Sequence, residues 1–392
     1  MKSPLRIAHE LAVTARFAGR ALARRLAGRV EPPPDRAAFR QRCERWLAAA
    51  PGDRLAGHHV VEVPGDRLPW LDTGLDLAAG ETVTFLAAGR VYLSRLLDIW
   101  VAPHFQLWFR IGETGEVFRG TREGHTVTAE RGGRLYLGNY FPGEWADRQG
   151  RLATDAKAYR KTSGGMTVLV LRWREGVDPG GALAALAAHE GAPPQARAEA
   201  GRLRDRIEPP ADWRYLWFLG PAEIYAPADG GMRCHTHADV GILRRELRLP
   251  LRPDTRLEWQ WKVDELPSTL AEDTVPTHDY LSIAVEFDNG QDITWHWSAA
   301  LPPETVYRCP LPTWRARETH IVIRSGTAGL GRWRSEARNV HDDCVRALGA
   351  PAGEIRAVWL IANSLFQRGH GRCEYRGIRL VDGEGVTEVT AP

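Results

Sequence analysis

The sequence lacks the features that mark several classes of protein. None of its apolar runs approaches the roughly 18 to 20 residues that a membrane-spanning helix requires. Its five cysteines are widely separated and form no CxxC pair, which argues against a disulfide scaffold and for a reducing compartment. There is no GxSxG elbow, P-loop, dinucleotide fingerprint or HExxH motif. We therefore expect a soluble cytoplasmic protein without nucleotide-driven chemistry.

The composition is that of a globular chain, but its charge is unevenly distributed. With 392 residues, 43% hydrophobic and 26% charged, the chain is long enough for two domains with real cores. Residues 1–30 hold Lys2 and six arginines against Glu10, so their net charge is 7 − 1 = +6. The remaining 362 residues then sum to −3 out of the total of +3. A near-neutral body without a concentrated basic face argues against nucleic acid as a partner.

The basic segment 1–30 has the apolar spacing of a helix. Small or apolar residues recur every three or four positions, at Leu5, Ala8, Ala12, Ala15, Gly19, Leu22 and Leu26. Arginines interrupt every stretch that could serve as the core of a secretory signal. The segment could lie on the anionic inner surface of a membrane as a peripheral contact. It could equally be a flexible arm, or a helix docked on the body or on a partner.

The rest of the chain predicts a mainly β protein. From residue 58, short alternating runs rich in Val, Thr, Tyr and Trp are separated by Gly and Pro, and a second such texture begins at Trp213. Between them, residues 177–212 carry ten Ala, five Pro and no aromatic side chain. We expect two antiparallel, jelly-roll-like β-sandwiches joined by a helical linker and preceded by an amphipathic helix. The expected boundaries are 1–50 for the N-terminal helical segment, 58–176 for the first sandwich, 177–212 for the linker and 213–385 for the second sandwich.

The first sandwich carries motifs of a known lectin fold. PWLDTG (69–74), AAGETVTFLAAGRV (78–91), FRIG (109–112) and GRLYLGNYFPGEWADRQG (133–150) follow one another at matching spacing. In these motifs the stretch from about 60 to 173 resembles the bacterial calcium-dependent galactose-binding lectins, which implies sugar binding at the loop after LYL. On that resemblance the ligand-binding residues would be Asn139, Tyr140 and Asp147. Because Tyr140 replaces an acidic residue and Arg148 opposes a cation, we do not expect calcium.

The second sandwich resembles a family without an established role. The motifs include LEWQWKVDELP (257–267), HDYLSIAVEFDNG (278–290), IVIRSG (321–326) and WRSEARNVHDDCVRALG (333–349). Through them, residues 213–382 are similar to an uncharacterised bacterial family, a domain of unknown function that often shares chains with this lectin-like module. The resemblance implies a concanavalin-like or jelly-roll sandwich and no particular reaction.

A histidine-rich run in the second sandwich suggests a metal site. In CHTHADVG (234–241), alternate side chains of an extended strand would place His235, His237 and Asp239 on one face. Two imidazoles and a carboxylate with an open position suit a divalent transition metal. The alternative is that the two histidines are polar surface groups of a half-exposed strand. No other cofactor is expected.

A hairpin predicted over residues 279–298 offers further polar and aromatic candidates. Glu286 and His296 would share one face and could act as general base and general acid, and His278 with Asp279 could line a cleft at the strand start. Trp295 and Trp297 could form a flat surface for a sugar ring. The alternatives are cross-strand pairing of the charged groups, strand-end capping by Asp279, and core packing of the two tryptophans.

Three functions follow as hypotheses. The first is binding of a carbohydrate or a similar hydroxylated small molecule by one or both sandwiches. The second is a cofactor-independent or metal-assisted lyase, hydrolase or cyclase with its site in a groove of the second sandwich. The third is a membrane-surface interaction protein that acts through residues 1–30. The fold alone does not choose among them, and the sequence does not set the oligomeric state.

Overall fold

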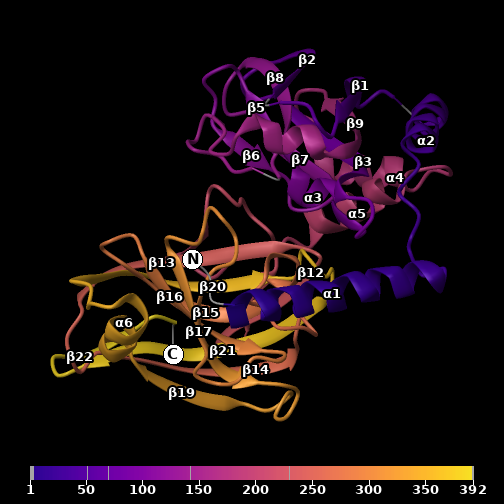
Figure 1. Ribbon diagram of the computed structural model, residues 1–392. Coiled ribbons are helices and arrows are strands. Elements are labelled where there is room, and N and C mark those ends of the chain that lie inside the picture. Colours follow the sequence, from indigo (N-terminus) through magenta and orange to yellow (C-terminus); the bar gives the residue numbers. More distant parts are fainter. Residues whose placement is uncertain (1–3, 51, 69, 142, 229, 391–392) are drawn as a thin grey trace. The chain divides into compact units, whose positions relative to one another are not determined.

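The computed structural model describes residues 4–50, 52–68, 70–141, 143–228 and 230–390 (Figure 1). The protein is mainly β and has an N-terminal helix, as the sequence predicts. It consists of two compact units. The C-terminal unit comprises Met1–Ala23, Ile207–Leu219 and Glu223–Pro392, and the middle unit comprises Arg24–Arg206 and Gly220–Ala222.

The middle unit is built on two sheets. The first has the order β1 (Leu55–Pro64), β9 (Ser163–Trp173), β3 (Thr82–Ser94) and β4 (Ile99–Val101), with β7 (Gly124–Thr128) also paired to β3. The second has the order β2 (Trp70–Leu77), β8 (Gly133–Asn139), β5 (Leu107–Ile111) and β6 (Val117–Arg119). Alternate side chains of both sheets, such as Phe85, Phe109, Leu137 and Val168, form one buried core.

Helices cover the other face of the five-stranded sheet. These are α2 (Arg36–Ala49), α4 (Pro179–Ala187) and α5 (Pro194–Arg204), and they share a second buried cluster with the sheet. Trp46 of α2 and Leu183 of α4 pack there with Leu169 and Leu171 of β9, residues that point away from the first core. The stretch 177–212, expected as a linker, therefore contributes two helices to the core of the middle unit.

The C-terminal unit is a sandwich of a seven-stranded and a six-stranded sheet. The larger sheet has the order β10 (Trp213–Tyr215), β13 (Val240–Pro250), β20 (Glu354–Asn363), β15 (Tyr280–Phe287), β16 (Asp292–Ser298), β18 (Glu318–Ser325) and β17 (Val306–Arg308). The smaller has β11 (Tyr225–Ala228), β12 (Gly231–His237), β21 (His370–Asp382), β14 (Arg256–Glu265) and β19 (Arg334–Asn339), with β22 (Gly385–Glu388) paired to β21. The short helix α6 (Val340–Leu348) follows β19.

The predicted hairpin is present as β15 and β16. Its turn closes with Phe287 N–H donating to Gln291 O at 2.9 Å, and Gly290 adopts a positive φ of 75° that favours glycine. In contrast, β16 pairs with β18 in parallel. A parallel partner must be reached by a crossover rather than a tight turn, so residues 299–317 form a long connection.

The two faces of the larger sheet differ in character. The alternate residues Trp295 and Trp297 of β16 face β14, where Trp259 and Trp261 meet them across the sandwich interior. Their neighbours along the strand point to the opposite face. That opposite face is covered in part by α1 (Pro4–Leu26), whose Val13 packs with Ala271, Leu301, Tyr307 and Val322. No helix in the described part of the chain is both long and apolar enough to cross a membrane.

Candidate metal centre

Four buried side chains converge on the covered face of the seven-stranded sheet. His278, Cys309, Glu318 and His320 each offer one ligand atom, and these atoms all lie within 4.8 Å of one another. Nε2 of His278 is 3.3 Å from Sγ of Cys309, and Nε2 of His320 is 3.3 Å from Oε1 of Glu318. All four side chains are closed off from solvent. We call this group the His/Cys/Glu cluster.

Two strands and two connections position the cluster. Glu318 and His320 are alternate residues of β18 and share the face that carries Thr294 of β16, which pairs directly with His320. His278 ends the turn that leads into β15. Cys309 follows β17, where Cys309 N–H donates to Glu318 O at 3.0 Å. The cluster is therefore assembled from segments separated in the sequence.

Hydrogen bonds outside the cluster orient its members. Nδ1 of His278 lies 2.6 Å from the backbone carbonyl oxygen of Glu272, which assigns the ring proton to Nδ1 and leaves Nε2 as the free lone pair facing Cys309. Tyr280 donates its hydroxyl to Oε1 of Glu318 at 2.8 Å. In metal sites, a ligand histidine usually donates its other ring N–H to a carbonyl or carboxylate oxygen, and a ligand carboxylate usually accepts a hydrogen bond from a neighbouring group.

Two further polar groups border the cluster. The ring of Tyr307 stacks on that of His320 with centroids 4.8 Å apart, and its hydroxyl lies 3.1 Å from Nε2 of His296. His296 is itself fully buried, and Nδ1 of its ring makes no hydrogen bond. Nδ1 of the buried His320 makes no hydrogen bond with a described group, and its Nε2 meets only Oε1 of Glu318 at 3.3 Å, without hydrogen-bond geometry. Unpaired imidazole nitrogens this deep are costly unless they serve as ligands.

Burial and neighbouring charges set the ionisation of the cluster. Burial lowers the pKa of His278 to about 3, and the adjacent His320 acts in the same direction. Burial would raise the pKa of Glu318, but interaction with the imidazole of His320 outweighs it and the pKa falls to about 2. Burial, with the nearby Glu318 carboxylate, raises the pKa of the Cys309 thiol well above its usual range. Glu318 is thus a buried carboxylate that the imidazole of His320 keeps ionised.

The donor set fits a divalent transition metal. In a tetrahedral zinc site with bonds of about 2.0 to 2.3 Å, neighbouring ligand atoms lie roughly 3.3 to 3.7 Å apart. Both 3.3 Å separations in the cluster match that spacing. A thiolate with two imidazoles favours zinc over the hard cations calcium and magnesium, and a thiolate and a carboxylate together balance a double positive charge.

The structure brings together only part of the catalytic set predicted from the sequence. His278 lies in the cluster and His296 borders it. Asp279 is buried instead beside the loop after β20, where it accepts the backbone N–H groups of Phe366 and Gln367 at 2.9 and 2.6 Å. His278 and Asp279 thus have different hydrogen-bond partners, and no hydrogen bond joins them among the described residues, so their pairing as acid and base stays a prediction.

Glu286 also lies away from the cluster. It shares a sheet face with His296, as expected. However, its partner across the hairpin is Asp292, and Asp292 lies four residues, or about 14 Å, from His296 along β16. Its carboxylate accepts from Arg244 at 2.8 Å and from the indole of Trp359 at 3.1 Å. The expected pairing of Glu286 with His296 is wrong for this reason.

The metal ligands predicted on one strand do not form a set of three. His235 and His237 do share the exposed face of β12, and His237 stacks on His370 with centroids 3.9 Å apart. The strand ends at His237, Ala238 takes a positive φ of 53°, and Asp239 is buried with its Oδ1 accepting Val240 N–H. The turn at Ala238 thus removes Asp239 from the face of the two histidines.

The predicted sugar-binding residues are mostly buried. Trp295 and Trp297 are core residues whose indoles donate to Asp343 Oδ2 and to Gly326 O, so they form no exposed platform. In the middle unit, Asn139 is buried and donates to Pro64 O, and Tyr140 is enclosed by aromatic rings. Asp147 is partly exposed and is held by Arg151 at 3.0 Å. Oδ1 of Asn139 and the hydroxyl of Tyr140 make no hydrogen bond with described groups, but both atoms are buried.

Sequence reasoning missed Cys309, Glu318, His320, Tyr280 and Tyr307 as partners. The alternation in the strand predicted over 319–325 placed His320 on one face, but the parallel pairing that brings it beside His296 leaves no local sequence signal. Cys309 lies outside the expected strands, in a connection whose path depends on the tertiary fold.

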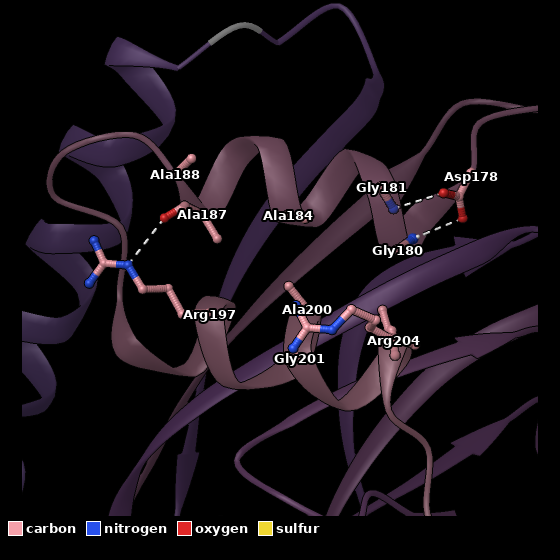
Figure 2. A pocket seen from close by; sticks show the side chains of 11 residues that line it. Asp178, Gly180, Gly181, Ala184, Ala187, Ala188, Arg197, Ala200, Gly201 and Arg204 are labelled. Carbon is pink, nitrogen blue, oxygen red and sulfur yellow. Dashed lines mark hydrogen bonds between the residues drawn. The ribbon is translucent and has the colours of Figure 1, made fainter.

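The middle unit contains two open pockets of its own. One, of about 640 Å³, runs between α4 and α5 and is lined mainly by Ala and Gly (Figure 2). Asp178 caps Gly180 and Gly181 there, and Arg197 donates to Ala187 O, so its polar groups are engaged within the helices. The other, of about 730 Å³, combines apolar Val117, Phe118 and Val127 with charged groups and with His125.

One protein-family model matches part of the C-terminal unit. Residues 213–379 match the model of a family described as "Protein of unknown function (DUF3047)", which confirms the expected likeness to a family without an established role. No curated protein matches the chain.

Solved structures give only distant likenesses. The EclA N-terminal domain, a PllA-like lectin, is 20% identical over 29% of this chain and 94% of its own, with a TM-score of 0.23. The xyloglucanase domain of NopAA from Sinorhizobium fredii is 7% identical over 47% and 91%, with a TM-score of 0.28. The CBM22 tandem domain of Xyn10C from Paenibacillus barcinonensis is 11% identical over 88% and 99%, with a TM-score of 0.23. At these scores none of them assigns a ligand or a reaction to this chain.

Proposed function

We propose that the C-terminal unit is a metal-binding β-sandwich that holds one divalent transition metal ion, zinc by preference, in the His/Cys/Glu cluster. The observation that carries this proposal is the convergence of four buried ligand atoms within 4.8 Å of one another. His278 and Cys309 supply one pair of ligands, and Glu318 and His320 supply the other.

The closed geometry favours a structural role for the metal. A catalytic zinc site keeps one position for water or substrate, whereas a structural site fills all four with protein ligands. Here four side chains are available and all are buried. Metal bound by them would tie the turn before β15 and the connection after β17 to β18, and so hold two loops on the sheet face.

Elemental analysis of the untagged full-length protein tests the proposal. We expect about one zinc per chain in the wild type, and loss of the metal in Cys309→Ala and His320→Ala. Cys344→Ala, which removes another buried thiol, is the matched control and should retain the metal. A metal-free wild type would overturn the proposal. Loss of metal in a His235→Ala, His237→Ala double variant would move the site to β12.

The pocket beside Phe118 supports a second candidate function, the binding of a carbohydrate or similar hydroxylated small molecule by the middle unit. Its wall joins an aromatic ring and aliphatic side chains to the charged Glu130 and Arg131, a mixture suited to a ring with hydroxyl groups. Nδ1 of His125, which also lines it, makes no hydrogen bond with described groups.

A glycan array on the full-length protein, followed by calorimetric titration of the best glycan, tests this candidate. Phe118→Ala should weaken binding about tenfold or more, as expected for loss of an aromatic contact. Glu113→Gln, a change outside the pocket lining, should leave it unchanged. If no glycan binds, or if Phe118→Ala binds as the wild type does, the pocket has no such role.

A further inference from the structure

The helix α1 is docked on the C-terminal unit through a side that buries the apolar residues Val13, Phe17 and Ala21 and also carries basic residues. Arg6 donates to Asp273 Oδ2 at 2.5 Å and to Asp273 O at 2.7 Å, and His9 Nε2 lies 2.9 Å from Asp273 Oδ1. Arg20 donates to the hydroxyl of Thr269. Val13 adds one apolar contact to the cluster around Tyr307. The docked side of α1 therefore combines buried apolar residues with basic residues that pair with the body of the protein.

A second row of apolar side chains on α1 faces outward. Five large side chains on it are exposed: Leu5 by 83%, Ile7 by 47%, Leu11 by 65%, Leu22 by 58% and Leu26 by 82%. At 100° per residue they fall within an arc of about 160°, and between them lie Ala8, Ala12, Ala15 and Gly19. This exposed stripe is separate from the buried row of Val13, Phe17 and Ala21, and so many exposed large apolar side chains on one side of a helix mark an interaction surface.

The positive charge beside the apolar stripe of α1 indicates what kind of surface binds to it. Arg16 and Arg25 are exposed and lie at the two edges of the apolar arc, and residues 1–30 carry a net charge of +6. A second copy of α1 on this stripe would place arginine beside arginine. Anionic lipid headgroups would instead neutralise the flanking arginines while the leucines enter the acyl boundary.

We propose that the outward stripe of α1 is a docking surface for an anionic membrane. The helix lies parallel to the bilayer, with Leu11 and Leu22 inserted and the guanidinium groups among the headgroups. Its opposite side keeps the contacts with Asp273 and Val322, so the C-terminal unit is carried to the surface without a spanning segment. This inference is independent of the metal centre.

Vesicle flotation with the full-length protein tests the proposal. The vesicles are phosphatidylcholine alone, or phosphatidylcholine mixed with anionic phosphatidylglycerol. We expect the wild type to float with the anionic vesicles at low salt. The double variant Leu11→Ser, Leu22→Ser should partition into these vesicles roughly tenfold or more weakly. Arg16→Glu, Arg25→Glu should lose the preference for anionic lipid. The matched control is Val386→Ser, which removes an exposed aliphatic side chain (56%) from β22 of the smaller sheet.

Three outcomes would overturn the docking surface. They are absence of flotation in the wild type, equal binding by the Leu11→Ser, Leu22→Ser variant, and equal binding to neutral and anionic vesicles. Light scattering on the same samples tests whether a second copy of the chain, instead of a membrane, covers the stripe. A dimer in the wild type that is lost in the leucine variant would assign the stripe to a second copy. Circular dichroism and the melting temperature check that each variant remains folded.

Discussion

Nε2 of His278 lies 3.3 Å from Sγ of Cys309, although 31 positions separate them in the chain. One residue closes the turn before β15 and the other leaves β17, so the contact joins the two connections that flank the covered sheet face. A metal ion shared by these residues would fix both connections. The first prediction concerns this effect on stability.

Removing the metal should destabilise the C-terminal unit. A chelator is expected to lower the melting temperature of the wild type by roughly 5 to 10 °C, because metal binding to the folded state adds to its stability. Cys309→Ala should melt at a correspondingly lower temperature and should no longer respond to the chelator. Scanning calorimetry measures both effects, with Cys344→Ala as the control that still responds. A wild type that melts identically with and without chelator contradicts the prediction.

The tryptophans of β16 should act in folding rather than in binding. Trp295 is fully buried and donates to Asp343 Oδ2 at 2.8 Å, so Trp295→Phe removes both volume and a hydrogen bond to a carboxylate. We expect a loss of about 2 to 4 kcal/mol in the free energy of unfolding, measured by urea denaturation. Trp333→Phe, at a half-buried position beneath Arg376, should cost less than about 1 kcal/mol. Similar costs for the two would argue against a core role for Trp295.

His125 should make the middle unit sensitive to acid. Burial lowers the pKa of His125 to about 3, and nearby arginines act in the same direction. The unfolded state therefore binds more protons between pH 6.5 and 3, so this contribution to stability is complete above pH 6.5 and falls as the pH decreases towards 3. The slope is at most about 1.4 kcal/mol per pH unit.

Urea denaturation at several pH values checks the titration of His125. His125→Gln should flatten the dependence between pH 6.5 and 4. His58→Gln, at an exposed position of β1, is the control and should not. If the two variants follow the same curve, His125 does not titrate with a lowered pKa.

Asp273 should hold α1 in place. Its carboxylate meets both Arg6 and His9, so Asp273→Asn weakens the attachment of the helix at both points. We expect amide hydrogen exchange in residues 4–23 to rise several-fold while β15 and β16 remain protected. Asp264→Asn, which changes another acidic residue of the same unit, should leave exchange in α1 unaltered. Unchanged exchange in Asp273→Asn would show that Val13 and its apolar neighbours suffice to hold the helix.

Local patterns predicted the fold better than the site. The alternation in residues 257–263 and 279–298 predicted β14 and the β15–β16 hairpin, because half-buried strands repeat every two residues. The alternation also showed that Trp295 and His296 face opposite sides. It could not show which side is the sandwich interior, since both faces of β16 are buried. The sequence therefore predicts a binding role for the buried tryptophans and pairs His296 with the distant Glu286.

The His/Cys/Glu cluster could not be predicted from the sequence, for a different reason. Its assembly depends on the parallel register of β16 with β18 and on the path of residues 299–317, both of which are set by tertiary packing. Short-range reasoning instead selected His235, His237 and Asp239, which are close in sequence. There the single positive φ at Ala238 was enough to separate the carboxylate from the imidazoles.

The order of the chain has a consequence for synthesis. Arg6 precedes its partner Asp273 by 267 positions, and the whole middle unit is encoded between them. At about 5 to 20 residues per second, the ribosome needs roughly 13 to 53 s to reach Asp273 after it has added Arg6. During that interval the nascent helix has no β-sandwich to pair with, and both of its sides are open to other surfaces. A newly made chain therefore carries α1 undocked until the second half of the sequence has been synthesised.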